Sequence, residues 1–179
     1  NPDDDVNLLR TINTPRRGIG RRTVEQLHAI ADERKISLYS AISLVIHGEI
    51  PPAEHGIGKA AVGSLQEYVE LIESYQERFE ESKHLAATTE RLVSELDYWG
   101  DLVQEFQKSE RAAKAKWKNI GFFIRSIDRY ETNPDVLEPT LQGYLNRISL
   151  QVKDELSDEE NALLARRLAA QDPPAGISA

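Results

Sequence analysis

The stretch TPRRGIGRRT, residues 14–23, holds the residue types best suited to chemistry in this chain. Gly18 and Gly20 lack side chains, so the backbone there can turn sharply and approach a ligand closely. A helix that begins just after them has unpaired N–H groups in its first turn, and such groups bind phosphate. Thr23 adds a hydroxyl donor. Positive charge for neighbouring phosphates comes from Arg16, Arg17, Arg21 and Arg22. The pattern predicts a helix-hairpin-helix element, which holds a nucleic-acid backbone without reading its bases.

The same stretch also fits a plain tight turn with solvated arginines. Two observations favour phosphate binding. The chain has a formal net charge of −8, so four clustered arginines stand out, and no acid lies between Val6 and Val24. The net charge argues against a generic nucleic-acid-binding domain, which is usually basic. The local arginine cluster can still attract a phosphate independently of the net charge, because salt screens charges that lie more than roughly 8–10 Å apart.

Two later segments repeat parts of this chemistry. A second Gly-Ile-Gly occurs in HGIGKAAVGSL, with Lys59 after Gly58 but Glu54 and His55 before Gly56. A turn that starts a long helix is the better interpretation, and a second DNA-contacting loop is the alternative. The segment RAAKAKWK, residues 111–118, places Arg111, Lys114 and Lys118 on one helix face. Such a face is usually solvated, and a second strip contacting the nucleic-acid backbone is the alternative.

Signatures of catalysis are missing from the sequence. No G-x-x-x-x-G-K-[ST] loop occurs, and Gly56-Ile57-Gly58-Lys59 has the wrong spacing for one. There are no cysteines, and the histidines at positions 28, 47, 55 and 84 lack paired ligand spacing. Pairs of acids fall on polar faces. We therefore expect no catalytic or metal-binding residue and no cofactor in this chain.

The helical periodicity of apolar residues predicts the helices that carry these motifs. An Asn cap at Asn1 with Pro2 in the first turn predicts a helix that ends before Pro15. Further helices are expected at about 21–34, after a Ser37 cap, at 59–82, 89–106, 111–130 and 139–150. Gly100 is expected to bend or interrupt the helix at 89–106. A capping box at 157–160 predicts a last helix to about residue 170. The predicted class is all-α, a multi-helix array without a sheet.

Composition restricts the location of the protein. No apolar run approaches the roughly 20 residues that a membrane helix needs. No signal peptide opens the chain, and disulfides are excluded by the lack of cysteine. We expect a cytoplasmic protein without a membrane partner. Methionine is also absent, even at position 1, so we expect a fragment or a processed or engineered chain.

The opening NPDDDVNLLRTINTPRRGIGRRTVEQL closely resembles the start of the 2B subdomain of superfamily 1A DNA helicases, the UvrD/Rep/PcrA group. The resemblance extends over about residues 1–157. It strengthens at LDYWGDLVQEF, at RAAKAKWKNI, which looks like the family's segment ending in an Arg/Lys-x-x-Asn helix, and at LEPTLQGYLNRISL. The chain lacks the family's continuation of the type V-x-L-M-T-x-H-x-x-K-G-L-E and reads NALLARRLAAQDPPAGISA instead. Residues 158–179 are expected to form a terminal helix and a flexible tail.

The resemblance implies a function. In that family, ATP and Mg²⁺ act in RecA-like domains, and 2B is a movable helical insertion that contacts duplex DNA, rotates and regulates unwinding. By resemblance, the expected DNA contacts are Thr14, Arg16, Arg17, Gly18, Gly20, Arg21, Arg22, Thr23, Gly56, Gly58, Lys59, Lys118 and Asn119. The resemblance implies duplex DNA and the other helicase subdomains as partners, in DNA repair or replication. It also implies that Asn1 and the Ser157 region lie close together. A helical protein-interaction scaffold without DNA binding is the alternative, and an independent enzyme is a third reading that the missing motifs disfavour.

Overall fold

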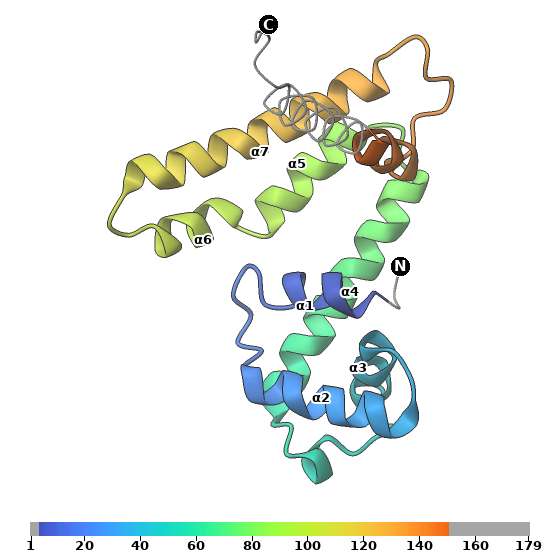
Figure 1. The fold of residues 1–179 in the computed structure, drawn as a ribbon, viewed down its shortest axis with the longest axis vertical. Helices are drawn as coiled ribbons and strands as arrows, with labels where there is room; N and C mark the ends of the chain where they lie inside the picture. The colour runs from blue at the N-terminus through green and yellow to red at the C-terminus, as the bar shows by residue number, and fades with distance from the viewer. Residues whose placement is uncertain (1–3, 151–179) are drawn as a thin grey trace, which may run out of the picture.

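The computed structural model describes residues 4–150, which are helical without any strand, as the predicted class requires (Figure 1). The elements in chain order are α1 (Asp5–Thr11), α2 (Arg21–Arg34), α3 (Leu38–Ile46), the short 3-10 helix η1 (Pro52–His55), α4 (Lys59–Glu81), α5 (Leu85–Glu95), α6 (Tyr98–Glu105) and α7 (Glu110–Glu131). Residues 141–150 form a further helical stretch.

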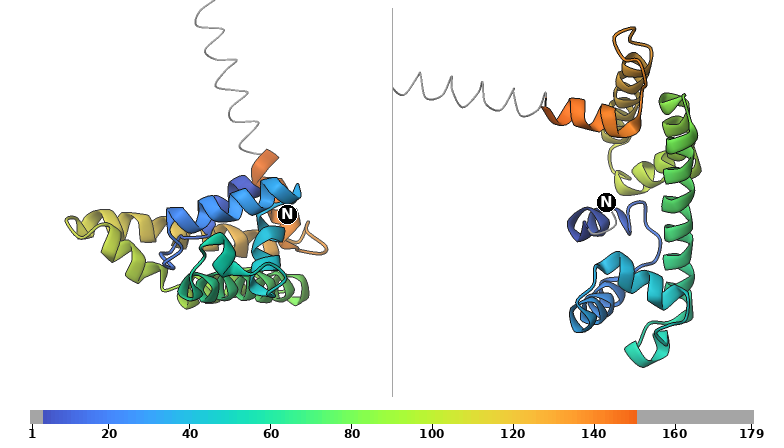
Figure 2. Two further views of the ribbon diagram at one scale, coloured as in Figure 1. Left: turned by 90° about the horizontal axis from the view of Figure 1, so that it is seen from below. Right: turned by 90° about the vertical axis from the view of Figure 1, so that its right-hand side faces the viewer.

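The long helix α4 links two groups of helices that lie on the same side of it (Figure 2). α1, α2 and α3 share a core with its first half, and this core includes Leu27, Ile42 and Leu65, which are fully buried. A second core joins α5, α7 and the stretch 141–150 around Leu85 and Ile127. Burial of each such aliphatic side chain contributes about 1.5–3 kcal/mol. The fold therefore has two small cores connected by one helix.

Most helix boundaries follow from their caps. Ser37 caps α3 and Ser109 caps α7, each with a side-chain oxygen that accepts from the backbone N–H three residues on. The expected cap at Asn1 was wrong for the described helix. Asp4 caps α1, because its Oδ1 atom accepts a hydrogen bond from the Asn7 N–H at 3.0 Å.

The single helix expected at 89–106 is two helices. The chain leaves α5 at Leu96 and restarts as α6 after Asp97, which has a left-handed φ of 46°. The Asp97 carboxylate caps α6 by accepting from the Gly100 N–H at 3.3 Å. A β-carbon at Gly100 would overlap that carboxylate, so the glycine permits the cap. The break therefore comes at Asp97, where a side chain can replace the lost helical bonds.

Some expectations fall outside residues 4–150: the capping box at 157–160, the last helix, the tail at 158–179, and the closeness of Asn1 to the Ser157 region. Within the described part of the chain, no helix combines the length and the apolar character needed to cross a membrane.

Candidate nucleic-acid interface

The two Gly-Ile-Gly segments have nearly the same backbone conformation. Gly18 and Gly56 both take a left-handed φ, +75° and +68°. Gly20 and Gly58 are both extended N-caps, at φ −76°, ψ 164° and φ −75°, ψ 156°. A positive φ favours glycine, so the first glycine of each segment is set by the turn itself. We call these segments loop 1 (residues 18–20) and loop 2 (residues 56–58).

The isoleucine between each pair of glycines anchors its loop in the core. Ile19 is 2% exposed and Ile57 is 3% exposed, and both belong to the core around α2, α3 and α4. The glycines on either side stay exposed. Each loop is therefore anchored to the core by one buried isoleucine, while its glycines are exposed to solvent.

The two loops pack against each other's helices in a reciprocal way. A β-carbon at Gly18 would lie 3.9 Å from the Ser64 hydroxyl of α4. One at Gly56 would lie 2.7 Å from Gln26 Nε2 and 3.7 Å from an Arg22 nitrogen, both on α2. Gln26 and Ser64 are equivalent positions in GIGRRTVEQL and GIGKAAVGSL, since each precedes the shared leucine. The tertiary structure thus brings both loops together in a pseudo-symmetric pair.

The helices that follow the loops begin without a hydrogen bond to a capping side chain. Neither α2 nor α4 has a side-chain cap or an acid in its first turn. The first paired amides are those of Val24 and Val62, which donate to Gly20 O and Gly58 O. Elsewhere in residues 4–150, the starts of α-helices are bonded to side chains, namely Asp4, Ser37, Asp97, Ser109 and, for α5, Glu131. The three amides before Val24 and before Val62 are therefore open donors at the positive end of a helix dipole.

Arg17, one of the predicted DNA contacts, is used inside the fold. Its Nη1 donates to the Thr11 carbonyl at 3.0 Å and to the Pro15 carbonyl at 3.2 Å. Its guanidinium carbon lies 5.4 Å from the centroid of the Tyr68 ring. Burial lowers the pKa of the Arg17 guanidinium. The backbone N–H of Arg17 donates to Asn13 Oδ1 at 2.8 Å, so this residue braces the approach to loop 1.

The other three arginines are exposed around the loops. Arg21 pairs with Glu25 at 2.8 Å, but the side chain of Arg21 is 92% exposed. Such surface pairs contribute little, about 0–1 kcal/mol, so this pair leaves the cation available to a phosphate. Arg22 lies beside Gly56 and so brings charge from α2 to loop 2. Arg16 stands before loop 1, while Thr23 is half-buried.

The fold also brings acids to loop 1, which the local sequence did not indicate. A polar cavity of about 380 Å³ lies between the segment before loop 1 and α6. Thr14 and Arg16 line one side of it, and Asp101 and Glu105 line the other. A phosphate held near Arg16 would meet these carboxylates. Loop 2 and the start of α2 carry the more open positive charge.

Lys118 and Asn119 do not join the loops. They are exposed on α7, which belongs to the second group of helices (Figure 1). Most of the remaining predicted contacts lie around the two loops at the other end of α4, whereas Thr14 and Arg16 lie beside α6. The residues predicted to contact DNA therefore lie on two separate surfaces, one around the paired loops and one on α7.

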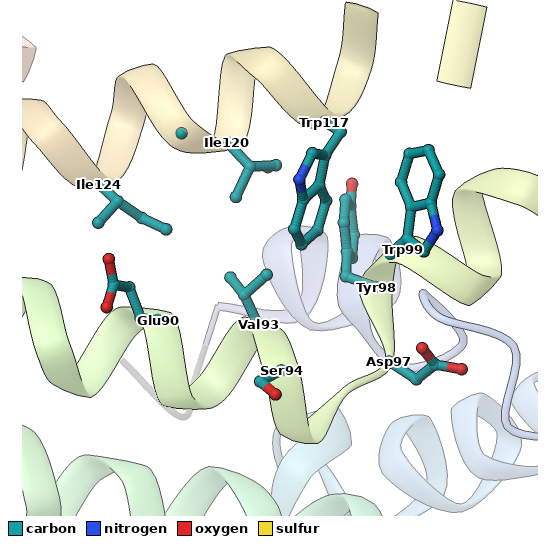
Figure 3. Close-up of a pocket in the computed structure, with 10 residues that line it drawn as sticks. Glu90, Val93, Ser94, Asp97, Tyr98, Trp99, Trp117, Ile120 and Ile124 are labelled. Atoms are coloured by element: carbon teal, nitrogen blue, oxygen red, sulfur yellow. The ribbon is translucent and has the colours of Figure 1, made fainter. Parts of the chain in front are cut away.

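An aromatic pocket of about 410 Å³ lies beneath α7. Figure 3 shows Trp117, Ile120 and Ile124 of α7 facing Val93 of α5. At its α6 end, the Trp99 and Trp117 rings meet edge to face with centroids 5.7 Å apart. The lining is largely apolar and also includes the polar side chains of Glu90, Ser94 and Asp97.

Two tyrosines of the described residues have raised pKa values and join neighbouring helices. Burial, and a hydrogen bond to Glu73, raise the pKa of Tyr39 to about 12. Burial and a hydrogen bond to Glu95 raise the pKa of Tyr75. Each tyrosine hydroxyl donates a hydrogen bond to a glutamate of the following α-helix. Within residues 4–150 no group of three or more His, Cys, Asp or Glu side chains is placed to hold a metal ion.

The chain is similar in sequence to known DNA helicases. The pattern of the UvrD-like helicase C-terminal domain family matches residues 1–164. The ATP-dependent DNA helicase PcrA of Bacillus subtilis is 24% identical over 163 residues, which cover 89% of this chain and 20% of the relative. PcrA of Staphylococcus aureus is 26% identical over 163 residues, covering 91% and 21%. The chain thus spans about a fifth of the length of these curated relatives.

Proposed function

The chain belongs to the UvrD-like helicase C-terminal domain family, and from this premise we propose that it is the 2B subdomain of a superfamily 1A DNA helicase. In this proposal the subdomain is non-catalytic, contacts the backbone of duplex DNA and regulates unwinding by rotating. ATP and Mg²⁺ would act in other domains of a 3′-to-5′ helicase. The observation that carries the proposal is the pair of uncapped helix starts behind loops 1 and 2.

Two open helix starts fit two phosphates. Each offers three backbone N–H donors in its first turn, and the helix dipole favours an anion there. The extended glycine N-caps, Gly20 and Gly58, have nothing within 4 Å of a β-carbon position, so a ligand can approach the backbone closely. Backbone donors and arginines contact phosphates without reading bases, so binding should be independent of sequence.

The proposed helix-hairpin-helix character rests on the repeat itself. The strings GIGRRTVEQL and GIGKAAVGSL share the glycines, the isoleucine, a basic residue, a valine and a leucine at equal spacing. Their helices pack reciprocally through Gly18 and Ser64 and through Gly56 and Gln26. Two similar loops side by side suit two backbone positions on one duplex.

A capping substitution tests the proposal. In the double variant Gly20→Asp/Gly58→Asp, each new carboxylate would bond the helix amides that a phosphate would use. We expect the variant to fold with equal or higher stability and to lose at least tenfold in affinity for a 20-bp duplex. The measurement is fluorescence anisotropy at two salt concentrations, paired with urea unfolding. The wild-type log K should fall with log[salt] by about 0.9 for each phosphate contacted.

The matched control is Ala87→Asp. It places one carboxylate, half the added charge of the double loop variant, in the first turn of α5, away from the loops. We expect it to bind the duplex as the wild type does. Equal duplex affinity for the double loop variant and the control would overturn the assignment of the loops.

A second candidate is a protein-interaction scaffold, favoured by one groove. A largely apolar cavity of about 720 Å³ runs along α4, between the segment before loop 1 and residues 140–145. Tyr68, Ile72, Tyr75 and Phe79 of α4 line it. Under this candidate the groove receives another helicase subdomain. A pull-down of such a subdomain, lost in Ile72→Glu and accompanied by no duplex binding, would favour it over the first proposal.

A further inference from the structure

A stripe of exposed side chains runs along α7 on the side away from the core. It consists of Arg111, Lys114, Lys118, Phe122, Arg125 and Arg129, which we call the α7 stripe. These positions recur every three or four residues, so they share one helix face. At a rise of about 1.5 Å per residue, the stripe is roughly 27 Å long. Five of its six members are cations, in a chain of net charge −8.

The opposite face of α7 does the packing. Ala113 and Ile127 are buried there, and Ile120 and Ile124 face α5 across the aromatic pocket. The helix therefore needs no cation of the stripe for its own attachment. Among residues 4–150, the only ion pair made by the stripe is that of Lys114 with Glu110, at 2.7 Å. Its positive charge is thus largely uncompensated.

Phe122 holds two of these cations in place. The residue is 50% exposed, so its ring is open to solvent. Lys118 Nζ lies 5.3 Å from the ring centroid, and the guanidinium carbon of Arg125 lies 4.6 Å from it. A cation over an aromatic ring is attracted by its quadrupole. The ring therefore orders two cations that would otherwise move freely over the surface.

This combination matches one ligand chemistry. Cations in a row attract a chain of phosphates, and exposed aromatic or guanidinium planes stack on unpaired bases. Duplex DNA offers phosphates but keeps its bases stacked inside. We propose that the α7 stripe binds single-stranded nucleic acid, with Lys118 and Arg125 on its backbone and the Phe122–Arg125 stack beneath a base.

This surface is separate from the loops. α7 belongs to the second group of helices, whereas loop 2 begins α4 at the far end (Figure 1). The stripe also shares no residue with either loop. The proposal therefore goes beyond duplex binding and does not depend on it.

Charge reversal tests the stripe directly. The variant Lys118→Glu/Arg125→Glu should weaken binding of a fluorescent 20-nucleotide oligothymidine at least tenfold at low salt. Its log K against log[salt] should lose about 1.4 of its slope, since each single-strand phosphate contact contributes about 0.7. Phe122→Ala should weaken binding about fivefold or more while urea unfolding stays unchanged, because the ring is exposed.

The matched control is Lys83→Glu/Lys116→Glu. It reverses the same number of exposed charges, and Lys116 lies on α7 outside the stripe. We expect this control to bind oligothymidine as the wild type does. That result would hold even if the loops failed to bind duplex.

Three outcomes would overturn the proposal. Equal losses in the stripe variant and its control would mean that only overall charge matters. A loss of duplex affinity with unchanged oligothymidine binding would assign the stripe to duplex DNA. Unchanged binding of both nucleic acids, with reduced binding of poly-glutamate, would assign it to an acidic protein.

Discussion

Gly56 lies so close to Gln26 that a β-carbon at position 56 would be 2.7 Å from Gln26 Nε2. Gly56 also has a φ of +68°, which costs an L-residue about 1–2 kcal/mol. At Gly18 the φ is similar, +75°, but the nearest atom is 3.9 Å away. Gln26 Nε2 is the end of a flexible side chain and can shift, so the left-handed φ is the main cost in both variants. We expect Gly56→Ala and Gly18→Ala each to cost about 1–2 kcal/mol. Urea unfolding of both variants checks this, and no loss at either position would contradict the left-handed turn.

Arg16 and Arg17 are adjacent but should respond differently to truncation. Arg17→Ala removes two hydrogen bonds to backbone carbonyls and the contact with Tyr68, so we expect a loss of about 1–2 kcal/mol. Arg16→Ala removes an exposed side chain and should change stability by less than about 0.5 kcal/mol. Duplex affinity, measured where both variants are folded, should fall for Arg16→Ala. A stable Arg17→Ala would show that its contacts do not support the fold.

The isoleucine in each loop should act as its anchor. Ile19→Ala and Ile57→Ala each remove a buried side chain, and such truncations cost about 2–5 kcal/mol. The matched change Val6→Ala lies at an exposed position of α1 and should be nearly neutral. Thermal unfolding by circular dichroism gives the comparison. Small losses at both isoleucines would mean that the loops are held by other contacts.

Tyr39 should make the fold sensitive to alkali. Burial, and a 3.1 Å hydrogen bond to Glu73, raise its pKa from 10.0 to about 12 in the folded state. In the unfolded chain this tyrosine ionises from about pH 10, while the folded chain keeps the proton. Its contribution is therefore complete below pH 10 and is lost as the pH rises toward 12. Urea midpoints at pH 8, 10 and 11 should fall less steeply for Tyr39→Phe than for the wild type.

The break between α5 and α6 should depend on Gly100. Gly100→Ala would push the Asp97 carboxylate out of its capping position, and loss of such a cap costs about 1 kcal/mol. Asp97→Asn should be tolerated, because asparagine also caps helices and accepts a left-handed φ. Near-ultraviolet circular dichroism of Trp99, two residues after the break, reports on α6. Equal spectra and stability for Gly100→Ala and the wild type would contradict this role.

Local patterns predicted most of the helices. α2 has the predicted bounds, α7 differs by one residue at each end, and Ser37 caps α3 as expected. These features arise within a few residues, from helical periodicity and from caps. The predicted position of the break, Gly100, was wrong by three residues. The observed break at Asp97 depends on one left-handed residue together with the space left by Gly100. Neither feature has a periodic signal.

The candidate site could be predicted only in part. The sequence indicated loop 1 and ranked loop 2 below it, because Glu54 and His55 precede loop 2. The fold changes that balance, since Arg22 of α2 reaches Gly56 while Asp101 and Glu105 of α6 lie across from Arg16. Charges that meet in space but lie far apart along the chain leave no local pattern.

The sequence by itself determined the helices, the two glycine turns with their exposed amides, and the charged face of α7. Each depends on neighbouring residues and on backbone geometry, which act at short range. Only the tertiary structure decided that the two loops pair, that Arg17 serves the fold, and that the α7 stripe lies apart from both loops. Those relationships follow from the burial of Ile19, Ile57 and the rest of the core, because burial fixes which helices meet.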